Sequence, residues 1–473
     1  ADKYTWLNNT VTGLADWMQT KAELATGFVT GWTGSASNNV FYVGHATDNT
    51  GMSISAAVDN AATGAIVNVA SGTYVQATQV NIDKDLSILG DGNAKAVITP
   101  GANFTGTSAA NAWFLVQPDV NASISNVVFD GSGWQVTQAL RSQGNTTVDN
   151  VDFRNILGNS PYLGFALLQF GGTVQGGIGS DTNGGGGSAG HLNVTNSTFT
   201  NIGRVGIEVK GDGSTATIFG NRFTGKGAGD WLDYAVEVGA AGTADILSNT
   251  ITDNLGVAST DGSTSAGILV TSYYGSVSSA TISNNFINGN TDAVALGYDG
   301  TDVSVVHANN NDLSGNAHAL NTTSANAVAD FEFNWWGSAN QSGVNAAIVG
   351  AGAASVDSAH FLKYGNDTQP STVGFQGNLT QISGTGTPSQ IIVEGFTLPA
   401  GTFVTSGGEI VLPSGILVGL ISPAAGPGAT GGKPKVVIVH SVQMLGQLLA
   451  EGYSAIIVDL NKDDDEIQQV AMN

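Results

Sequence analysis

The feature that most constrains the fold of this chain is a short phrase that recurs seven times between Ala122 and Asn316. The first copy reads ASISNVVFDGS, and a later one reads ATISNNFINGN. Each copy carries a large apolar residue three positions before its end, and these residues are Phe129, Phe153, Phe199, Phe223, Ile251, Ile287 and Leu313. They follow one another at intervals of 24, 46, 24, 28, 36 and 26 residues. Repeats of about 20 to 50 residues are typical of solenoids, in which each coil packs on its neighbours. The chain is therefore predicted to work through a long surface.

The repeated phrase also predicts which side chains fill the interior. Side chains alternate between the two faces of a strand, so a first interior column is expected at Ile124, Val148, Val194, Ile218, Ile246 and Ile282. The large apolar residues near the ends of the copies would form a second column. A further apolar strand is expected in each coil, at 205–209, 235–238, 267–270 and 293–296. Asparagine tolerates left-handed backbone, so Asn126, Asn150, Asn196 and Asn284 predict an asparagine ladder at the bend between two sheets.

Charge limits the partners of this chain. Asp and Glu number 37 against 14 Lys and Arg, which gives a net charge of −23. An acidic surface repels nucleic acid and anionic lipid, so neither is an expected partner. No apolar run reaches the roughly 18 residues of a membrane span, and the chain contains no Cys. This composition is common among exported proteins, and Ala1 would suit a mature end, so we expect an extracellular or cell-surface protein.

The segment before the repeats carries a family resemblance. It predicts a short helix at 54–61 and strands at 65–69, 78–82 and 86–89, with a tight turn at 71–74. A Gly-Thr-Tyr element at 72–74 is followed by Ile82, Lys84, Leu86, Ile88 and Gly90 at alternating positions. This pattern resembles the opening of right-handed parallel β-helix proteins of the pectate-lyase-like superfamily. The resemblance implies an all-β right-handed parallel β-helix solenoid. The Asn-Trp-Trp-Gly element at 334–337 is similar to the closing segment of exported β-helix proteins, and either packs the last coil or offers a sugar platform.

The chain is predicted to divide into five segments. These are a helical cap or docking segment at 1–50 (helix at 12–28), the β-helix at 51–352, a β-rich extension at 353–422, a Gly/Pro-rich linker at 423–434, and a small α/β segment at 435–473. Beyond the solenoid, strands are expected at 372–382, 390–396, 408–412, 416–421, 435–440 and 454–460. The last segment resembles the beginning of a domain of giant bacterial surface adhesins. Whether Asn473 is the native end therefore stays open.

A catalytic site has to be considered, because the superfamily includes polysaccharide lyases and hydrolases. Glu208 and Glu237 occupy matching positions on neighbouring strands, which would place them about 5 Å apart. Such a pair would be an acid/base pair, a cation site, or simply two outward residues in water. Asp230 and Asp233 lie between them in sequence. The Asp pairs of β-helix hydrolases and the Arg-centred motifs of the lyases are absent. We therefore predict no enzyme, with these four carboxylates as the alternative catalytic set.

Other ligands are predicted only weakly by sequence. The six His residues show no metal-ligand spacing, and no cofactor is expected, although Asp-containing turns at 261–262, 299–300 and 463–465 leave a structural Ca²⁺ open. Asn-x-Ser/Thr sequences, among them Asn121, Asn193 and Asn366, leave glycosylation open as well. The candidate glycan contacts are aromatic residues that we expect to be exposed: Trp134, Trp231, Tyr273 and Tyr274.

These observations predict a structural or adhesive extracellular protein. It would be a subunit of a cell-surface filament, layer or adhesin, and would self-associate through its non-repeat ends. Two alternatives remain, a polysaccharide depolymerase and a β-helix that binds glycan without turnover. The ligand and the symmetry of any assembly are not encoded in a recognisable motif.

Overall fold

The computed structural model describes residues 40–43, 53–90, 94–171, 190–378 and 381–383, together with seven short strands between 392 and 458. The side chains of 40–43 and of those seven strands are not described. The predicted helix at 12–28, most of the glycine-rich insertion at 171–190 and the linker at 423–434 lie outside the described residues. The division of the chain into five segments remains a prediction.

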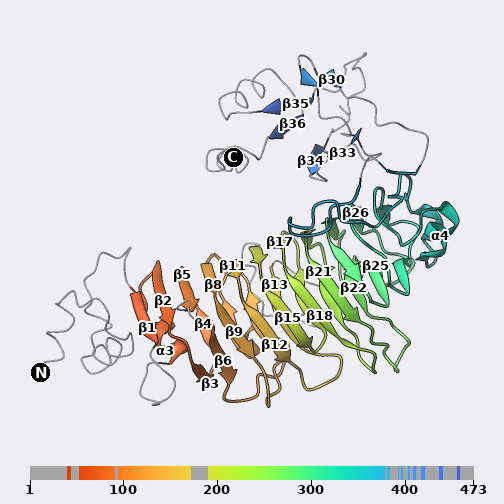
Figure 1. Cartoon of the computed structure of the whole chain (residues 1–473). Helices are drawn as coiled ribbons and strands as arrows, with labels where there is room; N and C mark the ends of the chain where they lie inside the picture. Colours follow the sequence, from red (N-terminus) through yellow and green to blue (C-terminus); the bar gives the residue numbers. More distant parts are fainter. Residues whose placement is uncertain are drawn as a thin grey trace, which may run out of the picture.

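Three parallel sheets wind around a common core and form a right-handed parallel β-helix (Figure 1), as predicted. Sheet A consists of β1 (Val40–Val43), β2 (Ala65–Val69), β5 (Leu86–Gly90), β8 (Asn121–Ser125), β11 (Asn145–Asp149), β14 (His191–Thr195), β17 (Thr215–Phe219), β20 (Thr243–Leu247), β23 (Ser279–Ser283), β26 (Val305–Asn309) and β28 (Val328–Asp330). Every strand in it pairs in parallel with the strand one coil away.

The other two sheets complete each coil. Sheet B consists of β3 (Thr73–Gln76), β6 (Ala96–Pro100), β9 (Val127–Asp130), β12 (Asp152–Ile156), β15 (Thr198–Ile202), β18 (Arg222–Gly227), β21 (Thr250–Asn254) and β24 (Phe286–Asn288). Sheet C consists of β4 (Val80–Ile82), β7 (Phe114–Val116), β10 (Gln138–Ser142), β13 (Phe165–Phe170), β16 (Val205–Lys210), β19 (Tyr234–Gly239), β22 (Ala266–Thr271), β25 (Asp292–Leu296), β27 (His318–Thr322) and β29 (Ile348–Val349). The predicted further apolar strands are strands of sheet C.

Short helices lie near the two ends of the solenoid (Figure 1). Helix α3 (Ile54–Asn60) is capped by Ser53, whose hydroxyl accepts from the Ala56 backbone N–H. Helix α4 (Gln341–Ala346) follows the last coils, and the 3₁₀ turns η3 (Ala109–Asn111) and η4 (Ala353–Ser355) are brief. Among the described residues, no helix combines the length and apolarity needed to cross a bilayer.

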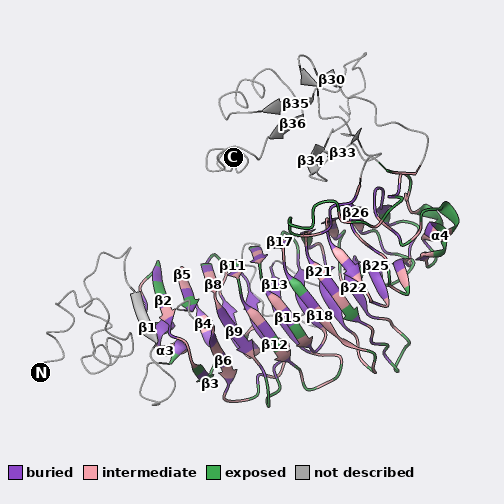
Figure 2. Ribbon diagram, in the orientation of Figure 1, coloured by how far each residue is buried: buried purple, intermediate pink, exposed green. Residues whose placement is uncertain are grey.

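Both predicted interior columns are confirmed. Ile124 pairs with Val148 and then, coil by coil, the column reaches Ile282, with every side chain fully buried. In the second column the Phe129 and Phe153 rings stack with centroids 5.0 Å apart and an interplanar angle of 4°. Buried and partly exposed positions alternate along β8, β11, β14, β17 and β20 of sheet A, whereas β10, β13, β16 and β19 of sheet C are buried throughout (Figure 2). Exact register between coils therefore turns a sequence repeat into continuous columns of like side chains.

The predicted turn at 71–74 is partly wrong, because its second half is strand. Thr73–Gln76 forms β3, which pairs with β6. Tyr74 and Gln76 point into the core and are buried, whereas Thr73 and Val75 are exposed. The glycine in Ser71-Gly72 suggested a turn. The following residues form a strand of sheet B because the alternating side chains of Tyr74 and Gln76 are buried in the core.

The asparagine ladder exists, and the predicted Asn126 and Asn150 are joined between coils, with Asn150 Nδ2 donating to Asn126 Oδ1 at 3.1 Å. Its fully buried part was not predicted, because it lies in later coils and at the next position of the bend. Asn126, Asn150, Asn196 and Asn284 do have left-handed backbone, with φ between 50° and 60°. The buried ladder consists of Asn221, Asn249, Asn285, Asn311 and Asn334. The Oδ1 atom of Asn285 accepts from the backbone N–H of Asn249 at 2.8 Å, and Asn285 N–H donates to Asn311 Oδ1 at 2.9 Å. Each amide thus satisfies backbone groups at a bend where no strand pairing is available.

The carboxy-terminal side of the solenoid is closed by packing and not by the predicted strand at 372–382. Trp336 is buried and lies 6.1 Å from the Phe331 ring, centroid to centroid, which supports the packing interpretation of the Asn-Trp-Trp-Gly element. Residues 372–378 are irregular and run along the bend between sheets A and B. Phe375 is fully buried there, and its N–H donates to Asn284 O at 2.6 Å.

The remaining strands are short. β30 (Ile392–Val393) pairs with β31 (Phe396–Thr397), and β32 (Phe403–Val404), β33 (Glu409–Val411) and β34 (Leu417–Leu420) form an antiparallel sheet. β35 (Val436–Val439) and β36 (Ala455–Val458) are parallel, as expected for a strand–helix–strand unit. The strands β33 to β36 fall within the predicted ranges 408–412, 416–421, 435–440 and 454–460. The single strand predicted at 390–396 is wrong, because β30 and β31 pair with each other in antiparallel fashion, and β32 was not predicted.

We expect Asn285→Ala to lower the free energy of unfolding by about 3 kcal/mol, because it leaves buried backbone groups unpaired. The Asn285 amide also donates to Ile246 O at 2.8 Å, so both a donor and an acceptor lose their partner. Urea unfolding followed by circular dichroism measures the change. Asn193→Ala, on the outer face of β14, is the matched control and should cost less than about 0.5 kcal/mol. Equal losses in the two variants would contradict a supporting role for the ladder.

Candidate functional site

Glu208 and Glu237 lie side by side on the outer face of sheet C. They are register partners in β16 and β19, as predicted. Their strand neighbours Ile207 and Val209 point into the core, so the carboxylates point outward. The interpretation as outward residues in water is nevertheless wrong, because Glu208 is only 2% exposed and Glu237 only 3%. The two carboxylates are therefore adjacent and covered.

Their surroundings are a mixture of charge and apolar packing. Leu168 and Leu269 are the register partners of Glu208 and Glu237 on the outer sides of the pair. Leu168 belongs to a small apolar cluster on the outer face of sheet C, against which Leu269 packs. Covered in this way, the carboxylates lose most of their hydration.

Two cations compensate part of this charge. The Nζ atom of Lys210 lies 3.6 Å from Glu208 Oε1 and 3.9 Å from the centre of the Tyr274 ring. Arg204 is close enough for its charge to interact with both Glu237 and Glu208. We call Arg204, Glu208, Lys210, Glu237 and Tyr274 the buried carboxylate cluster. Among the described residues, Glu208 Oε2, Glu237 Oε2 and Arg204 Nε are buried without a hydrogen-bond partner.

The cluster has the electrostatics of an acid/base pair. Burial raises the pKa of Glu208 to about 7, with Lys210 opposing and the Glu237 carboxylate adding to the rise. A carboxyl group whose pKa is raised towards neutrality is the kind of group that general acid–base chemistry uses. Direct contact with a polymer, however, requires the covering side chains to move.

The other two candidate carboxylates have separate roles. Asp230 is exposed and accepts from the Tyr162 hydroxyl at 2.5 Å and from Ser259 N–H at 2.8 Å, which joins three loops. These hydrogen bonds, that of Tyr162 first, lower the pKa of Asp230. Asp233 is buried and accepts from Lys226 N–H at 2.6 Å, while burial raises its pKa to about 6. Among the described residues, neither forms a hydrogen bond or ion pair with the Glu208–Glu237 pair.

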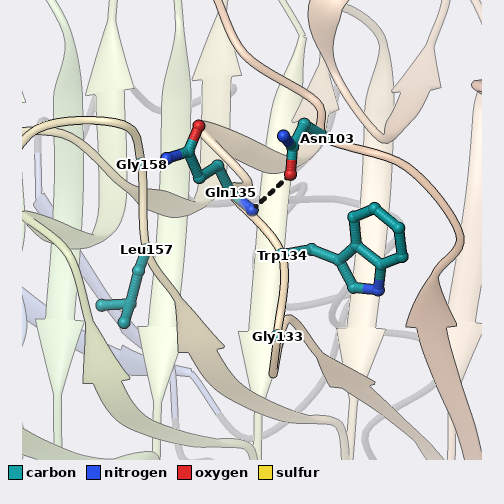
Figure 3. A pocket seen from close by; sticks show the side chains of 6 residues that line it. All are labelled: Asn103, Gly133, Trp134, Gln135, Leu157 and Gly158. Atoms are coloured by element: carbon teal, nitrogen blue, oxygen red, sulfur yellow. Dashed lines mark hydrogen bonds between the residues drawn. The ribbon is translucent and has the colours of Figure 1, made fainter.

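Trp134 lines a shallow cavity of about 460 Å³ on the outside of the solenoid (Figure 3). The lining residues come from the turns of three successive coils between sheets B and C, and are Asn103, Gly133, Trp134, Gln135, Leu157 and Gly158. We call this cavity the Trp134 groove. Its coils are tied together where Asn103 Oδ1 accepts from Gln135 N–H at 3.0 Å and Leu157 O accepts from Val136 N–H at 2.7 Å.

The groove combines an exposed indole ring with neutral polar groups. Trp134 is 40% exposed, and the amide side chains of Asn103 and Gln135 offer donors and acceptors. None of its six lining residues carries a charge. Sequence analysis found Trp134 but missed Asn103, Gln135 and Leu157, whose only signal was their place in equivalent turns of neighbouring coils.

The remaining predicted aromatic contacts separate into exposed and packed residues. Tyr273 is 52% exposed and lies 4.5 Å, ring centre to ring centre, from Tyr298, which is 53% exposed. Tyr274 instead contacts Lys210. Trp231 packs against Lys226 at 4.8 Å, and its indole N–H donates to Gly227 O. We call Tyr273 and Tyr298 the tyrosine platform.

Two of the three acidic turns considered for Ca²⁺ form local hydrogen bonds, and the third, at 463–465, lies outside the described residues. Asp261 accepts from Ser263 N–H at 2.9 Å, and Asp299 accepts from Thr301 N–H at 2.8 Å. Within the described part of the chain, no three Asp, Glu or His side chains converge in a manner that would hold a metal ion. A structural Ca²⁺ remains an untested expectation.

We expect Glu208→Gln to be more stable than the unmodified protein at pH 8, and to gain less over it at pH 5. Because the folded-state pKa of Glu208 is raised, stability is unaffected well below the ordinary value of 4.5 and falls as the pH rises to about 7. Glutamine stays neutral, so the variant escapes a penalty of about 3 kcal/mol at pH 8. Thermal unfolding at both pH values measures this, with Asp59→Asn at an exposed position as the control. A Glu208→Gln effect that is independent of pH would contradict the raised pKa.

A family model and a solved structure are similar to parts of this chain. Residues 43–231 match the family model described as rhamnogalacturonase A/epimerase, pectate lyase-like. No curated protein matches the chain. Among solved structures, that of pectate lyase Pel9A is similar, with 14% sequence identity, a TM-score of 0.34, and coverage of 62% of this chain and 78% of the other. The resemblance of 435–473 to an adhesin domain remains a prediction. The three parallel sheets identify this chain as a right-handed parallel β-helix, and its residues 43–231 are similar to the pectate lyase-like family model.

Proposed function

We propose that this protein is an extracellular, adhesive β-helix that binds polysaccharide at the Trp134 groove. The observation that carries the proposal is the exposed indole of Trp134, which stands in an uncharged groove beside two amide side chains. Aromatic rings combine a large apolar face with a polar edge, which suits the faces of sugar rings. Amides pair with sugar hydroxyls as both donor and acceptor.

Charge favours a neutral ligand at this groove. The chain carries a net charge of −23, which disfavours the approach of an anionic polymer. The family model that matches is named for enzymes of pectic polysaccharides, which supports a carbohydrate ligand in general. We propose a neutral polysaccharide as the class that this groove recognises.

A rigid solenoid suits an adhesive role. Neighbouring coils are joined along three continuous sheets, so the groove is held at a fixed position on a long stiff surface. We propose that such a protein attaches a cell surface to glycan. Self-association through the non-repeat ends belongs to this proposal and rests on the architecture alone.

We expect Trp134→Ala to reduce retention by neutral polysaccharides at least tenfold, because it removes the stacking ring. Trp134→Phe, which keeps an aromatic face, should retain an intermediate affinity. Affinity electrophoresis through gels containing β-glucan, galactan or arabinan measures retention. Tyr364→Ala, at an aromatic residue that is 53% exposed elsewhere, is the matched control and should behave like the unmodified protein.

The proposal is wrong if the unmodified protein migrates past all three polymers without delay, or if Trp134→Ala and Tyr364→Ala are retarded equally. Quenching of tryptophan fluorescence by oligosaccharide gives a second readout. Loss of quenching in Trp134→Phe would place the ligand at this ring.

A polysaccharide depolymerase is the second candidate function. It is favoured by one observation, the register pairing of Glu208 and Glu237 with an unpartnered oxygen on each, beside Arg204. Carboxyl groups about 5 Å apart are those of a retaining glycoside hydrolase. Catalysis would require the apolar cover of the pair to open on substrate binding.

Turnover decides between the two candidates. If the protein is a depolymerase, incubation with polyuronate and neutral polymers yields new reducing ends or unsaturated products, and Glu208→Gln and Glu237→Gln each lower the rate at least 100-fold. The Asp59→Asn control should retain the full rate. If the unmodified protein releases no product from a polymer that it demonstrably binds, the depolymerase candidate fails and the adhesive proposal stands.

A further inference from the structure

We propose that the tyrosine platform is a second polysaccharide subsite, separate from the Trp134 groove, so that one long polymer is held at two points. This inference rests on the proposed function, because it assigns the same ligand class to both places. The platform lies where the chain passes from sheet C to sheet A, after β22 and β25. The Trp134 groove lies where the chain passes from sheet B to sheet C.

Two neighbouring coils contribute one ring each to the platform. The ring planes of Tyr273 and Tyr298 are tilted by 57°, and about half of each residue is open to solvent. Val277 and Val303, on the same two turns, are also exposed. Exposed apolar surface on two neighbouring coils is the kind of patch that marks binding sites.

The platform is fixed from within by a buried carboxylate. Asp302 is only 2% exposed, and its Oδ2 atom accepts from Thr271 Oγ1 and from Ser272 N–H, both at 2.8 Å. Its Oδ1 atom accepts from Ser304 N–H at 2.9 Å. Asp302 therefore joins the turn that carries Tyr273 to the turn that carries Tyr298. Val303 N–H adds a second link by donating to Ser272 Oγ at 3.0 Å.

Tyr274 supports the platform from one side. Its ring meets Tyr273 edge-on at 4.9 Å and has Lys210 over its face at 3.9 Å. Tyr273 is thereby anchored to the outer face of sheet C. Aromatic residues that are held rigid bind with a small loss of conformational entropy, which is what a preformed binding surface requires.

The charge beside the platform selects an uncharged occupant. Asp299 adjoins Tyr298 in sequence, and the hydrogen bonds from Thr301, that of its hydroxyl first, lower the pKa of this exposed carboxylate. Asp299 is therefore ionised over the whole neutral range and repels anionic polymers. Neutral sugar rings stack on the tyrosine faces and leave their hydroxyls free to donate to this carboxylate.

The spacing of the two sites requires a polymer. β10 follows Trp134 and β22 precedes Tyr273, and these strands are four positions apart in sheet C. The offset along the solenoid is therefore about 19 Å, and the six residues of β22 add about 20 Å across it. A short oligosaccharide occupies either site alone, whereas a long chain reaches both and gains avidity through effective concentration.

The test compares short and long ligands in three variants. These are Trp134→Ala, the double variant Tyr273→Ala/Tyr298→Ala, and the Tyr364→Ala control. Titration calorimetry with the tetrasaccharide of the best-retained neutral polymer should give two sites per chain in the unmodified protein and in the control, and one in each of the other variants. Affinity for the intact polymer should fall at least tenfold in Trp134→Ala and in the double tyrosine variant, and should not change in the control. The variant that combines all three substitutions at the two sites should not bind.

The outcomes separate the two claims. If the tyrosine variant keeps both its stoichiometry and its polymer affinity while Trp134→Ala weakens binding, the second subsite is wrong and the proposed function stands. If only the tyrosine variant weakens binding, the Trp134 groove is wrong and two-point attachment falls with it. All the substituted residues are exposed, so we expect unchanged thermal midpoints. Unchanged midpoints show that loss of folding does not cause the loss of binding.

Discussion

Parallel pairing in register between successive coils is the constraint on which this structure depends. Each strand of a coil finds its hydrogen-bond partners only in the coils before and after it. A side chain is therefore placed directly against its counterpart one repeat away. Inside the solenoid this produces the stacked column from Phe129 to Phe223, in which each ring buries its apolar face against the next. It also produces the ladder from Asn221 to Asn334, in which each amide forms hydrogen bonds with the backbone of a neighbouring coil.

The same register creates the exceptions on the outside. Where two outward positions are both acidic, as at Glu208 and Glu237, pairing forces two carboxylates together, and the cover of Leu168 and Leu269 makes their meeting energetically expensive. Where outward positions at turns are aromatic, pairing joins Tyr273 to Tyr298. The candidate functional residues of this solenoid are thus those that depart from the repeat, because the repeated residues form the scaffold.

Much of the fold was predictable because it is periodic. The spacing of Phe129 and Phe153 contains the period, and the matching places of Glu208 and Glu237 predicted their adjacency. Burial of that pair was not predictable, because its cover comes from side chains of other coils. The Trp134 groove had the same difficulty, since Asn103 and Leu157 are joined to Trp134 only by the stacking of coils with unequal lengths. The segment at 372–382 was misread because its apolar residues insert singly, with Phe375 packing beside Phe286.

That segment changes how the solenoid would respond to force. A stack of coils usually frays from its last coil, because each coil is held only by its neighbours. Here Phe375 bonds to Asn284, Gly377 N–H donates to Asn310 Oδ1 at 2.9 Å, and a Cβ at Gly374 would lie only 2.6 Å from Ser248 Cα. The segment is thus held against three successive coils by hydrogen bonds and close packing. Tension applied to the chain beyond it would enter the stack at an interior coil and load several coils in shear, instead of peeling the terminal coil away.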